Sequence, residues 1–305
     1  MIFKIIFSVI ILFLFANDLS YSQLLVSQNM RYLPKFDSNY NRGYLANSFF
    51  NTEALITNGS YQGDKDKIYR IIGGLEIYRN EESVLWMSLG NELDANSKNN
   101  ISFNPRQSIW EEALNYSAKF KSSVVNIGLF YRCKHEIDNS DAPSGDTSSA
   151  GYIPIKRVLI LNGLNLGFSK DNDLGGGFNL KTNYEIEYYF VPDDYRQKTA
   201  EAYVKPDWNQ LTSVFKLNAR LNYMLLQKVE PYLRLKGDLF MFTRNTTAYY
   251  KNNYGVELGL SILGIQSDFD FFLIHESIFD ELAFLVPNSS KYTGIGIRLR
   301  GNNFF

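Results

Sequence analysis

The chain contains little of what most catalytic and metal-binding sites are built from. Its 305 residues include one cysteine and two histidines. A single cysteine excludes an internal disulfide framework, and two histidines leave few groups for acid–base chemistry near neutral pH. Because 31 Lys and Arg residues stand against 32 Asp and Glu residues, the formal net charge of -1 gives no electrostatic reason to expect a nucleic-acid partner. We expect no bound metal and no cofactor.

Long apolar runs are equally scarce, and the longest stands at the start of the chain. Residues 5–16 are almost entirely apolar and follow Lys4. Ser20 and Ser22 then supply the small residues that a signal-peptide cleavage site requires. The run is too short for a membrane core that a helix crosses with about 20 residues. We therefore predict a cleaved signal peptide over residues 1–22, with an uncleaved anchor helix as the alternative.

The rest of the chain has no second run long enough for a spanning helix, so if it enters a membrane it must cross as strands closed into a barrel. Aromatic residues make up 15% of the chain, which suits the aromatic girdles of such barrels. Residues 215–225 alternate between apolar side chains, such as Phe215 and Leu217, and polar ones, such as Lys216. Similar segments, each long enough for a tilted crossing of about nine to eleven residues, predict strands near residues 44–58, 67–79, 83–95, 108–121, 123–138, 152–168, 176–191, 210–226, 230–244, 253–265, 267–279 and 289–300.

The connections between these strands are predicted to alternate in length. Short turns are expected near residues 79–81, 121–123, 171–173, 227–228 and 266–267, and long polar connections near 59–66, 96–107, 138–151, 192–209, 245–252 and 280–290. Outer-membrane barrels combine short periplasmic turns with longer outer loops and an even number of strands. A soluble β-sandwich, the alternative fold, has no reason to sort its loops by length.

With its signal peptide, its alternating strands and loops, and its aromatic end Phe304-Phe305, the sequence resembles a bacterial outer-membrane β-barrel. The resemblance implies an all-β fold, an up-and-down antiparallel transmembrane β-barrel of about 12 strands over residues 44–305. Residues 23–43 would form a periplasmic lead-in or fold into the lumen as a small plug. The resemblance also implies an outer-membrane location, contact with membrane lipid and lipopolysaccharide, and recognition of Phe305 by the outer-membrane assembly machinery.

If the apolar face of the strands meets lipid, the opposite face lines the lumen and carries charges of both signs. An isolated buried charge is costly, so one hypothesis is a closed lumen in which basic and acidic side chains pair across strands. The other is a narrow aqueous path whose charged rings select a small polar solute. The predicted lumen charges are Arg70, Glu76, Glu92, Glu111, Lys119, Arg132, Lys134, Glu136, Lys181, Glu185, Glu187, Lys216, Arg220, Arg234, Lys236, Asp238, Glu257, Asp268, Asp270, Arg298 and Arg300.

His275 and Ser277 stand two residues apart, and the strand period places both on the lipid-facing side. The pair resembles the His-x-Ser pattern of outer-membrane phospholipases and lipid A deacylases, where it reaches an acyl ester. Ile278-Phe279 stands where the phospholipase pattern has Asn-Gly, and the sequence identifies no orienting third residue. We predict a non-enzymatic barrel, either a narrow channel for small polar solutes or a structural surface barrel with a charge-paired lumen. The alternative is a lipid-ester hydrolase that uses the His275 and Ser277 pair.

Overall fold

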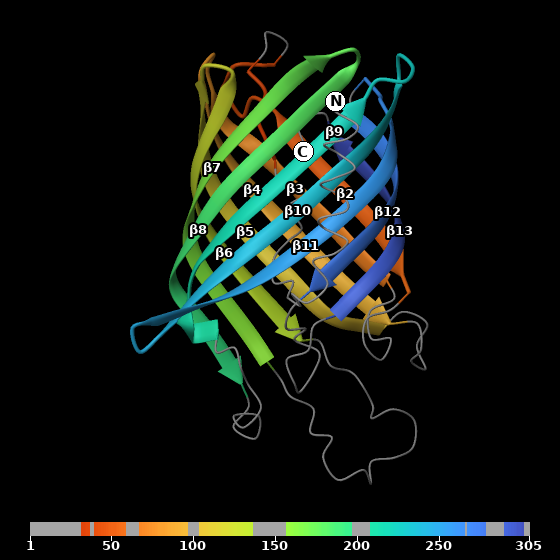
Figure 1. Ribbon diagram of the computed structural model, residues 1–305. Coiled ribbons are helices and arrows are strands. Elements are labelled where there is room, and N and C mark those ends of the chain that lie inside the picture. The colour runs from red at the N-terminus through yellow and green to blue at the C-terminus, as the bar shows by residue number, and fades with distance from the viewer. Residues whose placement is uncertain are drawn as a thin grey trace.

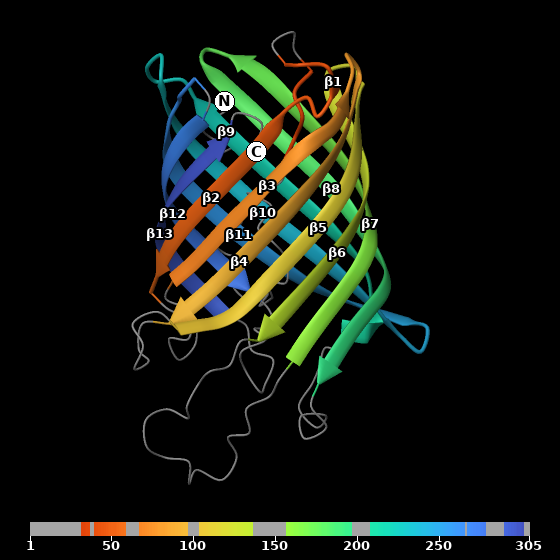
Figure 2. The same ribbon diagram turned by 180° about the vertical axis from the view of Figure 1, so that it is seen from behind.

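The computed structural model describes residues 32–36, 40–58, 67–96, 104–136, 157–196, 208–265, 267–278 and 290–301. Within them, twelve antiparallel strands, β2 to β13, follow one another around a single sheet, and β13 pairs with β2 to close it. Figures 1 and 2 show the closed barrel and the tilt of its strands from two sides. The predicted all-β, up-and-down barrel of about twelve strands is confirmed. No helix in the described ranges has the length and hydropathy needed to cross a membrane.

Each predicted strand overlaps an observed one. The strands of the barrel are β2 (Ser48–Thr57), β3 (Lys67–Arg79), β4 (Ser83–Asn96), β5 (Asn104–Phe120), β6 (Ser123–Glu136), β7 (Arg157–Gly175), β8 (Phe178–Arg196), β9 (Leu211–Tyr223), β10 (Val229–Arg244), β11 (Thr247–Ile262), β12 (Ser267–Ile278) and β13 (Ser290–Gly301). A short strand, β1 (Gly43–Tyr44), precedes β2 and pairs with the last residues of β3. The signal peptide predicted over residues 1–22 and the terminal Phe305 lie outside the described residues.

The barrel has two different ends. The connections β3–β4, β5–β6, β7–β8, β9–β10 and β11–β12 are short and lie together at the top of Figure 1, which we call the short-turn end. The other end is called the far end. The chain enters the wall through β1 at the short-turn end, and β13 finishes there.

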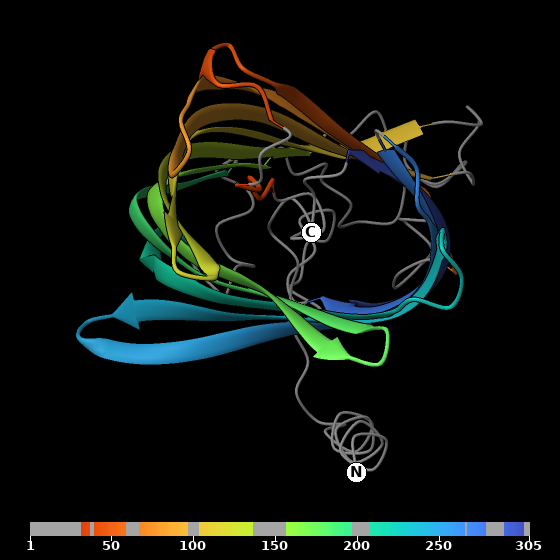
Figure 3. The ribbon, with the colours of Figure 1, turned by 90° about the horizontal axis from the view of Figure 1, so that it is seen from above.

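The connection between β10 and β11 differs from the prediction. Residues 245–252 are predicted as a long loop, but only Asn245 and Thr246 separate the two strands. Both residues have positive φ, 46° and 70°, as in a type I′ turn, whose twist matches that of the flanking strands. The pairing therefore continues to the tip, and the hairpin projects away from the barrel wall (Figure 3).

The turn predicted at residues 171–173 is also displaced. These residues pair with Asn179, Leu180 and Lys181, so that β7 and β8 are each 19 residues long. The turn falls at Gly176 and Gly177, whose φ values of 63° and 82° suit glycine and few other residues. The polar residues 171–173 are therefore part of a strand that extends into water, and the position of the turn is determined by the glycines.

The two faces of the wall have the polarity expected of strands in a membrane. In β9, Phe215 is 44% exposed on the outside, whereas the neighbouring Lys216 is 5% exposed and points inward. Residues directly opposed on neighbouring strands share a face, so the inward positions of β9 pair with inward positions of β8 and β10. The barrel thus presents apolar side chains outward and buries its polar ones, as lipid-embedded barrels do.

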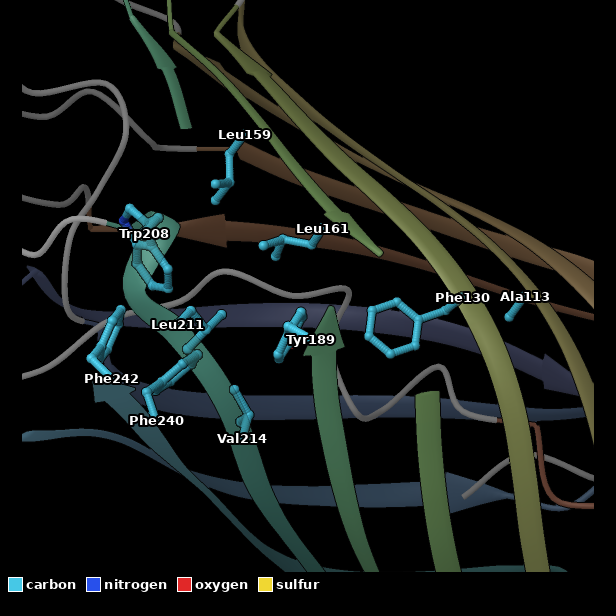
Figure 4. Close-up of a cluster of buried hydrophobic side chains, with 10 residues drawn as sticks. All are labelled: Ala113, Phe130, Leu159, Leu161, Tyr189, Trp208, Leu211, Val214, Phe240 and Phe242. Carbon is cyan, nitrogen blue, oxygen red and sulfur yellow. The ribbon is translucent and has the colours of Figure 1, made fainter. Parts of the chain in front are cut away.

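Apolar side chains fill the lumen near the far end on the side of β5 to β10. Trp208, in the short helix η4 (Trp208–Gln210), lies against Phe240 and Phe242, with ring centroids 5.9 and 5.2 Å from its own. Figure 4 shows these rings beside Leu211 and Tyr189 within the barrel. The complete cluster consists of Ala113, Phe130, Leu159, Leu161, Tyr189, Trp208, Leu211, Val214, Phe240 and Phe242.

The described part of the lead-in lies inside the short-turn end. The Tyr32 ring stacks on Phe49 with centroids 3.7 Å apart, and its hydroxyl donates a hydrogen bond to Glu76. Tyr32 is only 1% exposed. Arg79 donates to the carbonyl oxygen of Lys35 at 2.6 Å, and its guanidinium lies 5.6 Å from the centroid of the Phe36 ring. Residues 32–36 therefore pack on the inner wall at the short-turn end, and the two alternatives for residues 23–43, a periplasmic lead-in or a small plug, stay predictions.

Candidate functional site

Arg298 on β13 is the centre of a buried ionic network. Its guanidinium lies 2.7 Å from a Glu53 oxygen on β2, 2.9 Å from Glu257 on β11 and 3.1 Å from Asp270 on β12. All four side chains are 0% exposed. Burying such charges is tolerable only when each is closely paired and hydrogen-bonded. Closely paired side chains therefore occupy the lumen at this level.

The network continues to both sides of Arg298. Arg70 bridges Glu53 and Glu92, and its Nε is 2.5 Å from a Glu92 oxygen. On the other side, Arg220 and Arg300 both contact Asp270, at 3.3 and 3.1 Å. The Arg220 guanidinium also lies 3.7 Å from the centroid of the Tyr232 ring. Glu53 thus contacts two arginines and Asp270 three.

A second network spans β5, β6, β8 and β9. Arg132 contacts Glu111 at 2.5 Å and Glu187 at 3.0 Å. Lys216 contacts Glu187 at 2.5 Å and Glu185 at 3.8 Å. The apolar cluster that contains Tyr189 adjoins this network, because Arg132 also donates to the Tyr189 hydroxyl at 3.2 Å. Ion pairs and apolar rings together occupy this half of the lumen.

A third, uncharged network links β4 to β7. Trp86 donates to Ser117 at 2.9 Å, and Ser117 donates to Asn126 at 2.8 Å. Asn126 donates in turn to Asn115 at 3.1 Å and to Asn165 on β7 at 3.2 Å. Gly128 makes room for this group, because a Cβ there would stand 2.1 Å from the Asn115 amide oxygen. Neutral polar groups are therefore also paired inside the barrel.

Most predicted lumen charges lie on the inward face and take part in these networks. Arg234 is 0% exposed and donates to Asn218 at 3.0 Å, Lys134 is buried, and Asp238 accepts from Asn253 at 3.1 Å. Lys119 faces inward but is exposed at the short-turn end. The side chain of Glu136 lies outside the described part. The predicted residues that the structure brings into the two ionic networks are Arg70, Glu92, Glu111, Arg132, Glu185, Glu187, Lys216, Arg220, Glu257, Asp268, Asp270, Arg298 and Arg300.

Several buried carboxylates of the lumen escaped the sequence analysis, among them Glu53 and Glu276. Glu53 links Arg70 to Arg298, and Glu276 accepts from Lys236 and from Tyr292. The alternation of Asn51, Glu53, Leu55 and Thr57 in β2 marks Glu53 as inward-facing. That signal is weak, since Leu55 breaks the polar face. The inward direction of Glu276 follows from the outward placement of His275, because neighbouring residues of a strand face opposite sides.

The wall pair His275 and Ser277 lies near the far end of β12, and both are on the outward face by register. His275 Nδ1 is 3.0 Å from the hydroxyl of Thr293, the residue directly opposite on β13. Ser277 is 1% exposed, and its hydroxyl has no hydrogen-bond partner among the described residues. The structure therefore supplies an orienting group for the histidine, which sequence spacing could not show, but no bond between His275 and Ser277.

No protein-family model and no curated protein sequence matches this chain. Among solved structures, it is similar to the Salmonella typhi outer membrane phospholipase dimer with bound calcium, at 15% identity and a TM-score of 0.44 over 92% of this chain and 98% of that one. It is also similar to the β-domain of the Bordetella autotransporter Brka, at 12% identity and a TM-score of 0.49 over 85% and 98% of the two chains. The NanC porin gives 12% identity and a TM-score of 0.41 over 84% and 99%.

These three proteins carry different activities in their names, and all three TM-scores are below 0.5, so the likeness says nothing of the activity of this chain. The strand pairing itself establishes the closed barrel of twelve antiparallel strands.

Proposed function

We propose that the protein is a closed, non-conducting barrel of the outer membrane whose role is structural. The observation that carries the proposal is the complete burial of Arg298 among Glu53, Glu257 and Asp270. A permeation path lined by charges needs those charges to be hydrated and accessible to the solute. Paired charges without solvent exposure support the closed alternative over the narrow channel.

Conductance across a planar lipid bilayer tests this proposal. The purified full-length protein should insert without single-channel steps. The double variant Arg220→Ala/Arg298→Ala, which empties part of the lumen, serves as a reference for a leaking barrel. Steps in the unmodified protein whose ion preference changes in Arg220→Ala would show a channel and overturn the proposal.

A lipid-ester hydrolase is the second candidate, and the contact between His275 and Thr293 favours it. In nucleophilic catalysis the base is oriented by a third group on its other nitrogen, and Thr293 lies at that nitrogen. Attack on an ester would further require Ser277 to become accessible and to give its proton to His275.

Release of fatty acid from phospholipid vesicles separates the two candidates. A structural barrel should release none above background, with or without calcium. Release that is abolished by Ser277→Ala and lowered by Thr293→Val would make the hydrolase the function. Thr52→Val, at an outward position of β2, is the matched control and should leave any such activity unchanged.

A further inference from the structure

A cavity of about 310 Å³ opens at the short-turn end between the lead-in and strands β5 to β8. One side is formed by Leu33, Pro34 and Phe36 of the lead-in. The other sides are formed by the β5–β6 hairpin, by the last part of β7 and by the first part of β8. We call it the lysine cavity, because the lysines that line it are Lys35, Lys119, Lys121, Lys170 and Lys181.

The charge of the lysine cavity is unbalanced. Its five lysines are accompanied by a single carboxylate, Asp171. None of the five forms an ion pair with a carboxylate of the described residues, and Asp171 instead accepts a hydrogen bond from Asn179 at 2.5 Å. The Lys121 ammonium lies 5.8 Å from the centroid of the Phe120 ring.

Two of these lysines point into the barrel. Lys119 and Lys181 occupy inward positions of β5 and β8, as their cross-strand partners show. The residue directly opposite Lys181 on β9 is Arg220, whose own contacts are made with Asp270 and Ser261. Like charges in directly opposed positions repel. The arrangement therefore gains stability from an anion that enters the cavity.

We propose that the lysine cavity binds a phosphate-bearing anion. Lysines bind phosphate as mobile point charges, and Ser122 and Ser123 add hydroxyl groups to the lining. The volume is at the lower end of the range for small-molecule sites, about 300–1,000 Å³. It accommodates a head group with a small apolar part against Phe36, but no acyl chains.

The same chemistry has two sources at a membrane surface. A soluble phosphate ester could enter from the aqueous side, or an anionic phospholipid could place its head group in the cavity. Titration calorimetry of the full-length protein with glycerol phosphate, in a detergent free of phosphate, tests the first source. Nanodiscs that contain phosphatidylglycerol, with bound lipid counted after purification, test the second.

The inward lysines should determine the affinity for whichever probe binds. Replacing Lys119 and Lys181 together by alanine should raise Kd about tenfold for each charge removed, as expected for charge-assisted hydrogen bonds. Lys35→Ala, on the lead-in and outside any strand, should weaken binding without disturbing the barrel. Lys228→Ala, at the same end but outside the cavity lining, is the matched control and should bind like the unmodified protein.

Heat-dependent gel mobility reports whether each variant retains a closed barrel. Binding of either probe that is lost in the Lys119 and Lys181 variant and kept in Lys228→Ala supports the site and identifies its source. Failure of both probes to bind, or equal affinity for the unmodified protein and the double variant, would overturn the proposal.

Discussion

The centre of the lumen and the lysine cavity contain the same kinds of side chain in opposite states of pairing. In the centre, Arg298 contacts three carboxylates. In the lysine cavity, Lys119 and Lys181 contact none among the described residues. Both sets of side chains lie on the inward face of the same sheet. Position on the inner face therefore does not by itself decide whether a charge is paired.

Access to water explains the difference. The central charges have no exposed surface, so the protein itself must replace their hydration. The cavity opens at the end of the barrel, where solvent and salt screen a charge that lacks a protein partner. Removing a charge should therefore be costly in the centre and nearly neutral at the mouth.

The largest effect is expected for Arg298→Ala. This change leaves Glu53, Glu257 and Asp270 buried without their shared cation, and breaking a buried pair costs about 3–5 kcal/mol. Urea-induced unfolding in lipid vesicles, followed by gel mobility, measures the loss. A free energy of unfolding within about 1 kcal/mol of the unmodified protein would contradict the assignment of Arg298 as the centre of the network.

A slightly smaller effect is expected for Trp208→Ala. The change removes the indole that packs on Phe240 and Phe242, and truncating a buried aromatic residue costs about 3–5 kcal/mol. We expect the lower value, because the short helix η4 can relax into the space. The loss should not depend on salt, and a strong salt dependence would mean that charges, and not apolar contacts, stabilise this part of the lumen.

The smallest effect is expected for Lys181→Met, which keeps the length of the side chain and removes its charge. Relief of repulsion from Arg220 should change the free energy of unfolding by less than about 1 kcal/mol, with a gain in stability as the expected sign. The same unfolding measurement checks it. A loss as large as that of Arg298→Ala would show that Lys181 has a partner inside the protein and would remove the contrast between the two regions.

Much of the wall could be predicted because its physical rule is simple. A strand between lipid and a polar lumen must alternate, and the segment around Phe215 and Lys216 does so without interruption. The inward placement of Arg298, Glu257 and Glu187 follows from the same rule. The polar residues 171–173 and 245–252 misled the prediction because strands here continue beyond the apolar zone, where polarity no longer separates strand from loop.

Contacts between separate strands could not be predicted. The pairing of His275 with Thr293 depends on the register of β12 against β13. The insertion of Tyr32 beside Phe49 depends on the path of a segment that has no periodic pattern. The lysine cavity joins residues from the lead-in and four strands, and only the inward direction of Lys119 and Lys181 was predicted from the sequence.

The position of Arg298 bears on the order in which the barrel is completed. Glu53 belongs to β2 and Arg298 to β13, and the two are directly opposed where the last strand meets the first. A slip of two residues in one direction would set Gly296 against Glu53 and leave the carboxylate without its cation from β13, whereas a slip in the other direction would set Arg300 there. The ion pair therefore disfavours the first of these two slips at closure. Without β13, β2 and β12 would both be open edges and Glu53 would keep Arg70 as its contact but lose Arg298, so the final strand completes the backbone pairing and the ionic network together.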